Sequence, residues 1–211
     1  MQKQKKLSDL LGGQKVVPVA VIEDESQALG LPKALLDGGV RVIEITLRSD
    51  YALIAIAKIK KEFPEMMILA GTVCSAEQMI AAVQAGAEGI ISPGFTEALA
   101  KQAQKLDVPY LPGVATASEA LLASQYGLTE FKLFPADIAG GVSALKAFSG
   151  PFLDFKFCPT GGVNKDNYLE FLALDNVMCV GGSWLAPKQA ARAGDWDAIS
   201  QLCKDALAGL T

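Results

Sequence analysis

The chain has 211 residues, 51% of them hydrophobic and 20% charged, which excludes a disordered chain and predicts one globular domain over residues 1–211. Its 19 Lys and Arg against 23 Asp and Glu give a net charge of -4, which argues against nucleic acid as a partner. Because the chain contains no histidine, it cannot build a Ser-His-Asp relay or the usual histidine-rich zinc sites. Any proton transfer must therefore use carboxylates, lysine, cysteine or tyrosine.

Features that report on location favour a cytoplasmic protein with no membrane partner. The first residues, 1–11, are polar and basic and lack the apolar core of a secretory signal. The apolar run at 16–22 is far shorter than the ~20 residues that a membrane-spanning helix needs. The 4 cysteines form no C-x-x-C pair, so we expect reduced thiols, mostly buried in the core.

Short β-branched runs alternate with helix-length segments from end to end. Residues 3–14 predict a short helix that ends at the Gly12-Gly13 pair and covers one end of the fold. Helical periodicity is clearest over 51–63 and 196–210. Strands are expected to begin near Val16, Val40, Met67, Glu88, Val108, Thr129, Asp154 and Asn176. Expected helix N-caps are Ser75, Thr96, Ser118 and Asn164.

Strands that each precede a helix leave two architectures open. One is an open, doubly wound parallel sheet, and the other is a closed (β/α)₈ TIM barrel. The barrel fits better, because the repeat is regular and no unit reads as an edge strand. Function in such a barrel gathers at the carboxyl ends of the strands, where inward-facing side chains meet the loops.

Alternation in the second strand directs three polar side chains into the barrel. Ile43, Ile45 and Leu47 should face the helices, which leaves the inward positions to polar side chains. These inward residues are Glu44, Thr46 and Arg48. A buried glutamate is costly unless it is paired, so either a structural Glu44–Arg48 ion pair or a catalytic carboxylate is possible.

The sixth strand places a lysine in the same interior. In the segment 131–135, Lys132 and Phe134 should point inward. Burial disfavours the charged ammonium and can lower a lysine pKa to roughly 7–8, which gives an amine able to form a Schiff base with a carbonyl substrate. The other reading is a lysine that extends to the barrel mouth.

Two loops near the C-terminus carry glycine pairs at matching positions. Thr160, Gly161 and Gly162 follow the seventh strand, and Gly181, Gly182 and Ser183 follow the eighth. Each pair precedes a possible helix start, where exposed N–H groups attract anions. TIM barrels often bind phosphate at these two loops, so we expect a phosphate site here.

These segments together resemble a known family. VRVIEITLR (40–48), AGTV (70–73), ISPG (91–94), KLFPA (132–136), CPTGG (158–162) and GGSW (181–184) occur in this order and span nearly the whole chain. The pattern closely resembles the class I aldolases of 2-keto-3-deoxy-6-phosphogluconate (KDPG), which also cleave 4-hydroxy-2-oxoglutarate (KHG). The resemblance implies pyruvate and glyceraldehyde 3-phosphate as products, no metal or other cofactor, and a homotrimer.

The resemblance also assigns roles to individual residues. It implies that Lys132 forms the Schiff base and that Glu44 is the acid/base carboxylate. Substrate-binding roles fall to Arg48 and Thr72 near the pyruvate carboxylate, to Pro93 and Phe134 in the pocket walls, and to Thr160, Gly161, Gly162, Gly182 and Ser183 around the phosphate. Thr72 and Pro93 are indicated by the resemblance alone.

Other functions remain open at the level of sequence. Residues 137–139, where relatives vary, leave the galactonate epimer of the substrate possible. A metal-dependent aldolase would normally need histidine ligands. A sugar-phosphate epimerase or isomerase, or a barrel that binds a sugar phosphate without catalysis, would use Lys132 only as a contact.

Overall fold

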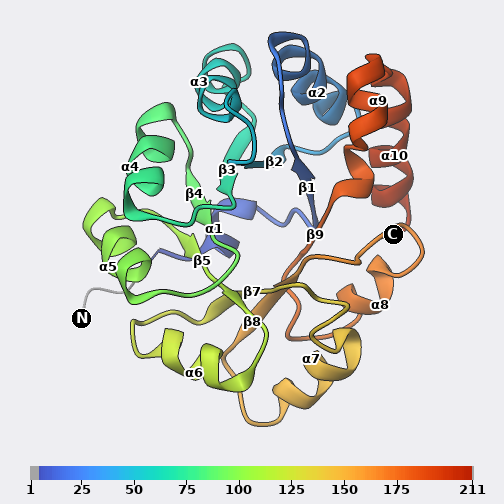
Figure 1. The fold of residues 1–211 in the computed structure, drawn as a ribbon. Coiled ribbons are helices and arrows are strands. Elements are labelled where there is room, and N and C mark those ends of the chain that lie inside the picture. The colour runs from blue at the N-terminus through green and yellow to red at the C-terminus, as the bar shows by residue number, and fades with distance from the viewer. Residues whose placement is uncertain (1–4, 211) are drawn as a thin grey trace.

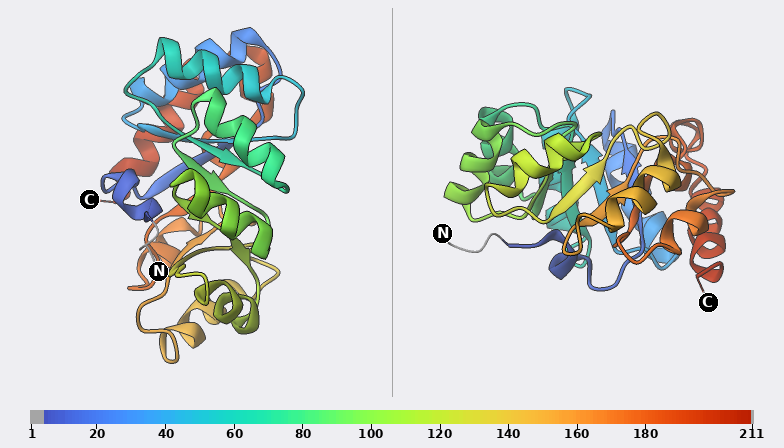
Figure 2. Two further views of the ribbon diagram at one scale, coloured as in Figure 1. Left: turned by 90° about the vertical axis from the view of Figure 1, so that its left-hand side faces the viewer. Right: turned by 90° about the horizontal axis from the view of Figure 1, so that it is seen from below.

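The computed structural model describes residues 5–210 and shows parallel strands that close into a ring surrounded by helices (Figure 1). Two further views show the helices outside the strands on each side (Figure 2). The strands are β1 Val16–Ala20, β2 Val42–Thr46, β3 Met67–Gly71, β4 Gly89–Ile91, β5 Tyr110–Leu111, β6 Gly113–Val114, β7 Glu130–Leu133, β8 Lys156–Pro159 and β9 Val180–Gly182.

Hydrogen bonds connect these strands around the ring. One sheet has the order β5-β4-β3-β2-β1-β9, and the other has the order β6-β7-β8. Bridges from Thr160 to Gly181 and from Phe157 to Val177 join β8 to the β9 segment. The closed barrel that the regular repeat favoured is therefore confirmed, and the open sheet is wrong.

The fifth strand of the barrel is divided into β5 and β6 by Pro112. Proline has no N–H to donate to a neighbouring strand. Pairing continues on both sides, because the Pro112 carbonyl accepts from Lys132 N at 2.8 Å and Gly113 N donates to the Ser92 carbonyl at 3.0 Å. β5 and β6 thus form the one strand expected near Val108.

The last strand is shorter than expected. It begins at Val180, whereas the sequence pattern suggested a start near Asn176. Phe157 N donates to the Asn176 carbonyl at 2.8 Å and Met178 N to the Phe157 carbonyl at 3.0 Å, which makes an isolated bridge rather than a ladder.

Helices follow the strands and pack on the outside of the ring. Ser75 and Thr96 cap helices as expected, since each side chain accepts an N–H of the first turn. The other two expected caps are wrong: Thr116 is the cap in place of Ser118, and Asn167 in place of Asn164. The helices are α2 Glu25–Asp37, α3 Ala52–Glu62, α4 Ala76–Ala85, α5 Glu97–Leu106, α6 Ala117–Ser124, α7 Gly141–Ser149, α8 Tyr168–Leu172, η1 Ser183–Leu185, α9 Lys188–Ala193 and α10 Trp196–Ala208.

The first helix, α1 Leu7–Leu11, covers the amino-terminal ends of the strands, as expected from its position. Leu7 is buried against Gly89, where an added Cβ would lie 2.8 Å from the leucine Cδ1. Ser8 donates its N–H to the carboxylate of the buried Glu130 at 3.0 Å. The helix ends at Gly12, in the left-handed conformation that glycine favours. Residues 3 and 4 of the expected helix lie outside the described residues. Within the described chain, none of the helices combines the length and apolar character that a membrane crossing requires.

Candidate active site

A cavity of about 400 Å³ opens at the carboxyl ends of the strands. All the site residues expected from the sequence line it, together with Val19, Thr46 and Val163. A larger cavity of about 600 Å³ lies near α1 and is lined by residues such as Lys5, Glu130 and Lys156, none of them a candidate. The lining residues of the first cavity are Val19, Glu44, Thr46, Arg48, Thr72, Pro93, Lys132, Phe134, Thr160, Gly161, Gly162, Val163, Gly182 and Ser183.

A buried ion pair lies at the base of this cavity. Nζ of Lys132, on β7, lies 3.0 Å from Oε1 and 3.4 Å from Oε2 of Glu44, on β2. The two residues are 5% and 1% exposed, so both charges are shielded from water. Nζ also lies 5.1 Å from the ring centroid of Phe134, in the range of a cation–π contact. The lysine is therefore neither alone in an apolar interior nor extended to the barrel mouth.

Gly71, at the end of β3, makes the room that the Glu44 side chain occupies. An added Cβ at this glycine would lie 2.2 Å from Oε1 of Glu44, far inside van der Waals contact. β3 is the hydrogen-bonded neighbour of β2, with Gly71 paired to Thr46. Gly71 lies in the AGTV segment of the family resemblance, but the sequence alone assigns it no role. The only available signal was a glycine at the carboxyl end of an otherwise apolar strand.

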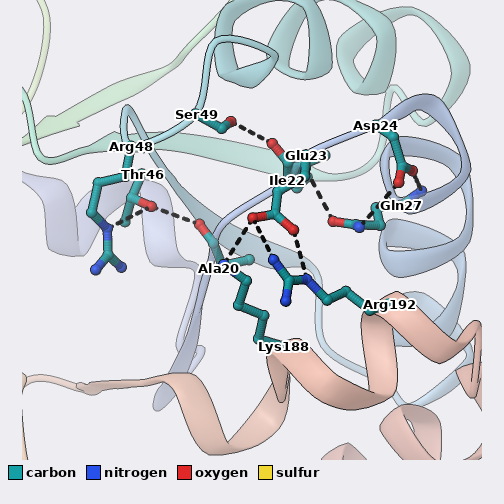
Figure 3. Close-up of polar contacts among 10 residues, drawn as sticks. All are labelled: Ala20, Ile22, Glu23, Asp24, Gln27, Thr46, Arg48, Ser49, Lys188 and Arg192. Atoms are coloured by element: carbon teal, nitrogen blue, oxygen red, sulfur yellow. Dashed lines mark hydrogen bonds and ion pairs between the residues drawn. The ribbon is translucent and has the colours of Figure 1, made fainter.

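Arg48, just beyond the end of β2, is held by Thr46, the last residue of that strand (Figure 3). Its Nε donates to Thr46 Oγ1 at 3.2 Å, and Thr46 Oγ1 donates to the Ala20 carbonyl at 3.0 Å. Within residues 5–210, the ion pair of Glu44 is with Lys132, so the structural Glu44–Arg48 pair is wrong. Nε is already bonded, which leaves the two terminal amino groups of the guanidinium to bind a carboxylate.

The wall formed by Thr72 and Pro93 depends on an unusual backbone and a buried hydroxyl. Thr72 has a φ of 58°, a left-handed conformation that is uncommon for a β-branched residue and is often found at functional sites. Ser92, before Pro93, donates to the Gly94 carbonyl at 2.7 Å and lies 2.7 Å from the hydroxyl of the buried Tyr110. These contacts hold the Pro93 turn in place.

The two glycine-rich loops lie side by side on the remaining wall. Gly161 and Gly162 have φ values of 94° and 77°, which other residues adopt only with strain. Gly181 packs against Thr160, where an added Cβ would lie 2.4 Å from the threonine Oγ1. Ser183 opens η1, as expected, whereas the helix after Gly162 begins only at Tyr168. The possible helix start after the first glycine pair therefore lies further along the chain, beyond the expected cap at Asn164.

Similarity to known proteins extends over nearly the whole chain. The family described as KDPG and KHG aldolase matches residues 7–202. The KHG/KDPG aldolase of Escherichia coli K12 is 50% identical over 194 residues, covering 92% of this chain and 91% of the relative. A Pseudomonas aeruginosa protein named 2-dehydro-3-deoxy-phosphogluconate aldolase is 46% identical, over 98% of this chain and 94% of its own length.

Solved structures are similar over the same extent. The KDPG aldolase of Legionella pneumophila, crystallised with pyruvate captured at low pH as a covalent carbinolamine intermediate, aligns with a TM-score of 0.92 and 44% identity. That alignment covers 95% of this chain and 97% of the other. The Zymomonas mobilis enzyme with 3-phosphoglycerate aligns with a TM-score of 0.89 and 40% identity, over 95% and 94% of the two chains.

Proposed function

Because this chain belongs to the KDPG and KHG aldolase family, we propose that Lys132 and Glu44 carry out the class I aldol cleavage that defines the family. The enzyme is a Schiff-base aldehyde-lyase that cleaves KDPG to pyruvate and glyceraldehyde 3-phosphate, and it also acts on KHG. The observation that carries the residue assignment is the buried pair of Nζ and Oε1, 3.0 Å apart, at the base of the cavity.

The first step forms the imine. The ammonium of Lys132 passes a proton to Glu44, and the neutral amine attacks the C2 ketone of the substrate. Glu44 gives this proton to the alkoxide that results and takes a second one from the charged nitrogen, which yields the carbinolamine. It then passes the second proton to the carbinolamine hydroxyl, which leaves as water and gives the protonated imine. A carbinolamine of this kind, the adduct of an amine and a ketone, is the species captured in the Legionella relative. At 3.0 Å, the carboxylate is within reach of the nitrogen, and the oxygen on the adjacent C2 lies one bond further from that nitrogen.

The second step breaks the C3–C4 bond. The protonated imine accepts the electron pair of that bond while Glu44, directly or through water, removes the proton of the C4 hydroxyl. Glyceraldehyde 3-phosphate leaves, and the remaining enamine takes a proton on C3 from Glu44. Water then hydrolyses the imine to pyruvate and free Lys132. One carboxylate thus serves every proton transfer in turn.

Binding roles follow from the position of each wall. Arg48 presents a planar, bidentate partner for the C1 carboxylate, close to Thr72. Pro93 and Phe134 supply apolar walls beside the carbon chain. Backbone N–H groups near Gly161, Gly162 and Gly182, with the Ser183 hydroxyl and Thr160, bind the phosphate at the other end.

A steady-state assay tests the proposal. Wild-type protein should release pyruvate from KDPG, and Lys132→Arg should lower that rate to background, because a guanidinium forms no imine. Full activity in Lys132→Arg would contradict the assignment. Activity should also survive EDTA, since no step uses a metal. Competitive turnover of KDPG, KHG and the galactonate epimer ranks the substrates.

We also propose a cytoplasmic homotrimer in which residues 1–211 form one domain. Ile138, before α7, and Leu153, after it, are 82% and 83% exposed, an unusual exposure for large apolar side chains, and this favours a subunit contact beside α7. Light scattering coupled to gel filtration should give three times the mass of one chain. A monomer at micromolar concentration would contradict the trimer.

A further inference from the structure

The loop between β1 and α2 is held by charged side chains that lie outside the cavity (Figure 3). Glu23, in this loop, accepts from Arg192 through both carboxylate oxygens, with Nε to Oε2 at 2.8 Å and Nη2 to Oε1 at 3.1 Å. Nζ of Lys188 lies 2.8 Å from Oε1. Both cations belong to α9, so a single carboxylate joins the loop to this helix.

The same loop supports the segment that carries Arg48. The carbonyl of Ala20, where β1 ends, accepts from Thr46 Oγ1 at 3.0 Å, and the carbonyl of Ile22 accepts from Ser49 Oγ. These two donors flank Arg48 in the sequence, and Thr46 also accepts from Nε of Arg48. The backbone just before Glu23 therefore holds Thr46 and Ser49, and through Thr46 it fixes the position of the Arg48 guanidinium.

The ion pairs of Glu23 lie at the surface, where such contacts add little to folding stability. The side chains of Glu23, Lys188 and Arg192 are 31%, 51% and 58% exposed. Their arrangement is nonetheless specific, because the guanidinium meets the carboxylate bidentately and a second cation shares one oxygen. Contacts that have a defined geometry but add little to folding stability are suited to positioning the loop.

We propose that Glu23 is a positioning residue, which by holding the β1–α2 loop on α9 keeps Thr46, and through it Arg48, in register with the substrate carboxylate. This inference rests on the proposed function, in which Arg48 binds the C1 carboxylate. Glu23 lies in the loop and contacts α9, and it is absent from the lining of the cavity. Its loss should weaken binding at the carboxylate end and leave the chemistry at Lys132 intact.

Steady-state kinetics of Glu23→Gln test this directly. We expect KM for KDPG to rise roughly tenfold with kcat within about a factor of two of wild type, the signature of lost binding without lost chemistry. Glu97→Gln is the matched control, because Glu97 forms an exposed pair with Lys101 on α5, away from the cavity. Its KM should match wild type, and thermal unfolding should show both variants folded.

A double variant distinguishes the effect of loop position from the effect of the local net charge. Glu23→Gln with Arg192→Gln restores the local net charge of the wild type but not the bidentate contact. Its KM should remain raised. A KM that returns to the wild-type value would assign the effect to charge and overturn the proposal, as would an unchanged KM in Glu23→Gln.

Pyruvate binding, measured by NMR titration without turnover, separates this inference from the proposed function. The dissociation constant of pyruvate should rise in Glu23→Gln by a factor similar to that of KM. If the wild type binds pyruvate but cleaves no KDPG, the proposed function fails while the variant still tests the positioning. Equal pyruvate affinity in wild type and Glu23→Gln would overturn the positioning role.

Discussion

The amine of Lys132 and the carboxylate of Glu44 meet across the barrel, 3.0 Å apart, although 88 residues separate them in the sequence. Both side chains are almost fully buried, so the proton exchange that we propose between them takes place in a site that excludes most water. Removing one partner of a buried pair leaves the other uncompensated, which is costly for a charged group. Under the proposed mechanism, the same contact stabilises the barrel interior and carries the proton transfers.

Replacing the carboxylate by an amide tests the role of Glu44. Glu44→Gln keeps the shape of the side chain and loses proton transfer, so kcat should fall by roughly 10²–10⁴-fold. Pyruvate should still bind, since Arg48 and the walls are unchanged. Stopped-flow and steady-state rates measure the loss. An unchanged kcat would reduce Glu44 to a structural partner of Lys132.

Gly71→Ala tests the space that Glu44 occupies. The new Cβ would lie 2.2 Å from Oε1, so the carboxylate must move away from Lys132. A displacement of about 1 Å can lower a rate by roughly 10²-fold, and we expect a loss of this size in kcat. Gly150→Ala is the control, because the nearest atom to its new Cβ is 4.0 Å away. Equal activity of the two variants would contradict the packing argument.

Thiol labelling tests the burial of the cysteines. Cys74 is exposed, whereas Cys158, Cys179 and Cys203 are buried. Burial raises the pKa of Cys203 to about 12. The pKa of Cys179 is also raised, first by its hydrogen bond with Cys158 and then by burial, so neither thiol ionises at neutral pH. A thiol reagent should label Cys74 quickly in the folded protein and the other cysteines only after unfolding. Rapid labelling of a second cysteine would show that the barrel opens.

Glu23 should titrate at a lower pH than an ordinary glutamate. Hydrogen bonds from Arg192 and then Lys188 lower its pKa from 4.5 to about 2. Because the pKa is lowered in the folded protein, the contribution of the pairing to folding stability is complete above pH 4.5. It is lost as the pH falls through about 2. Carbon-13 NMR of the carboxyl group measures this midpoint. Arg192→Gln should raise it, whereas Lys101→Gln should leave it unchanged. A midpoint near 4.5 in wild type would contradict the ion pairs.

Strand alternation predicted which side chains enter the barrel. Residues two apart lie on the same face of a strand, so Glu44, Arg48 and Lys132 could be placed inside from local sequence alone. Pairing between Lys132 and Glu44 could not, because β2 and β7 are not hydrogen-bonded neighbours. Their contact depends on how the ring closes.

Local signals also failed where a stronger competing signal lay nearby. Ser118 is a good capping residue, but Thr116 and Glu119 form a capping box that starts the helix earlier.

The contacts of Glu23 with Lys188 and Arg192 correspond to no sequence motif, and these partners lie 165 and 169 residues away. Side chains that meet only through the folded barrel leave no pattern in the sequence.

Covalent trapping tests the central role of Lys132 most directly. Protein incubated with pyruvate and reduced with borohydride should gain one stable adduct per chain, located by peptide mass spectrometry on Lys132. Lys132→Arg should gain none under the same conditions. An adduct on a different lysine, or no adduct in active wild-type protein, would contradict the Schiff-base mechanism.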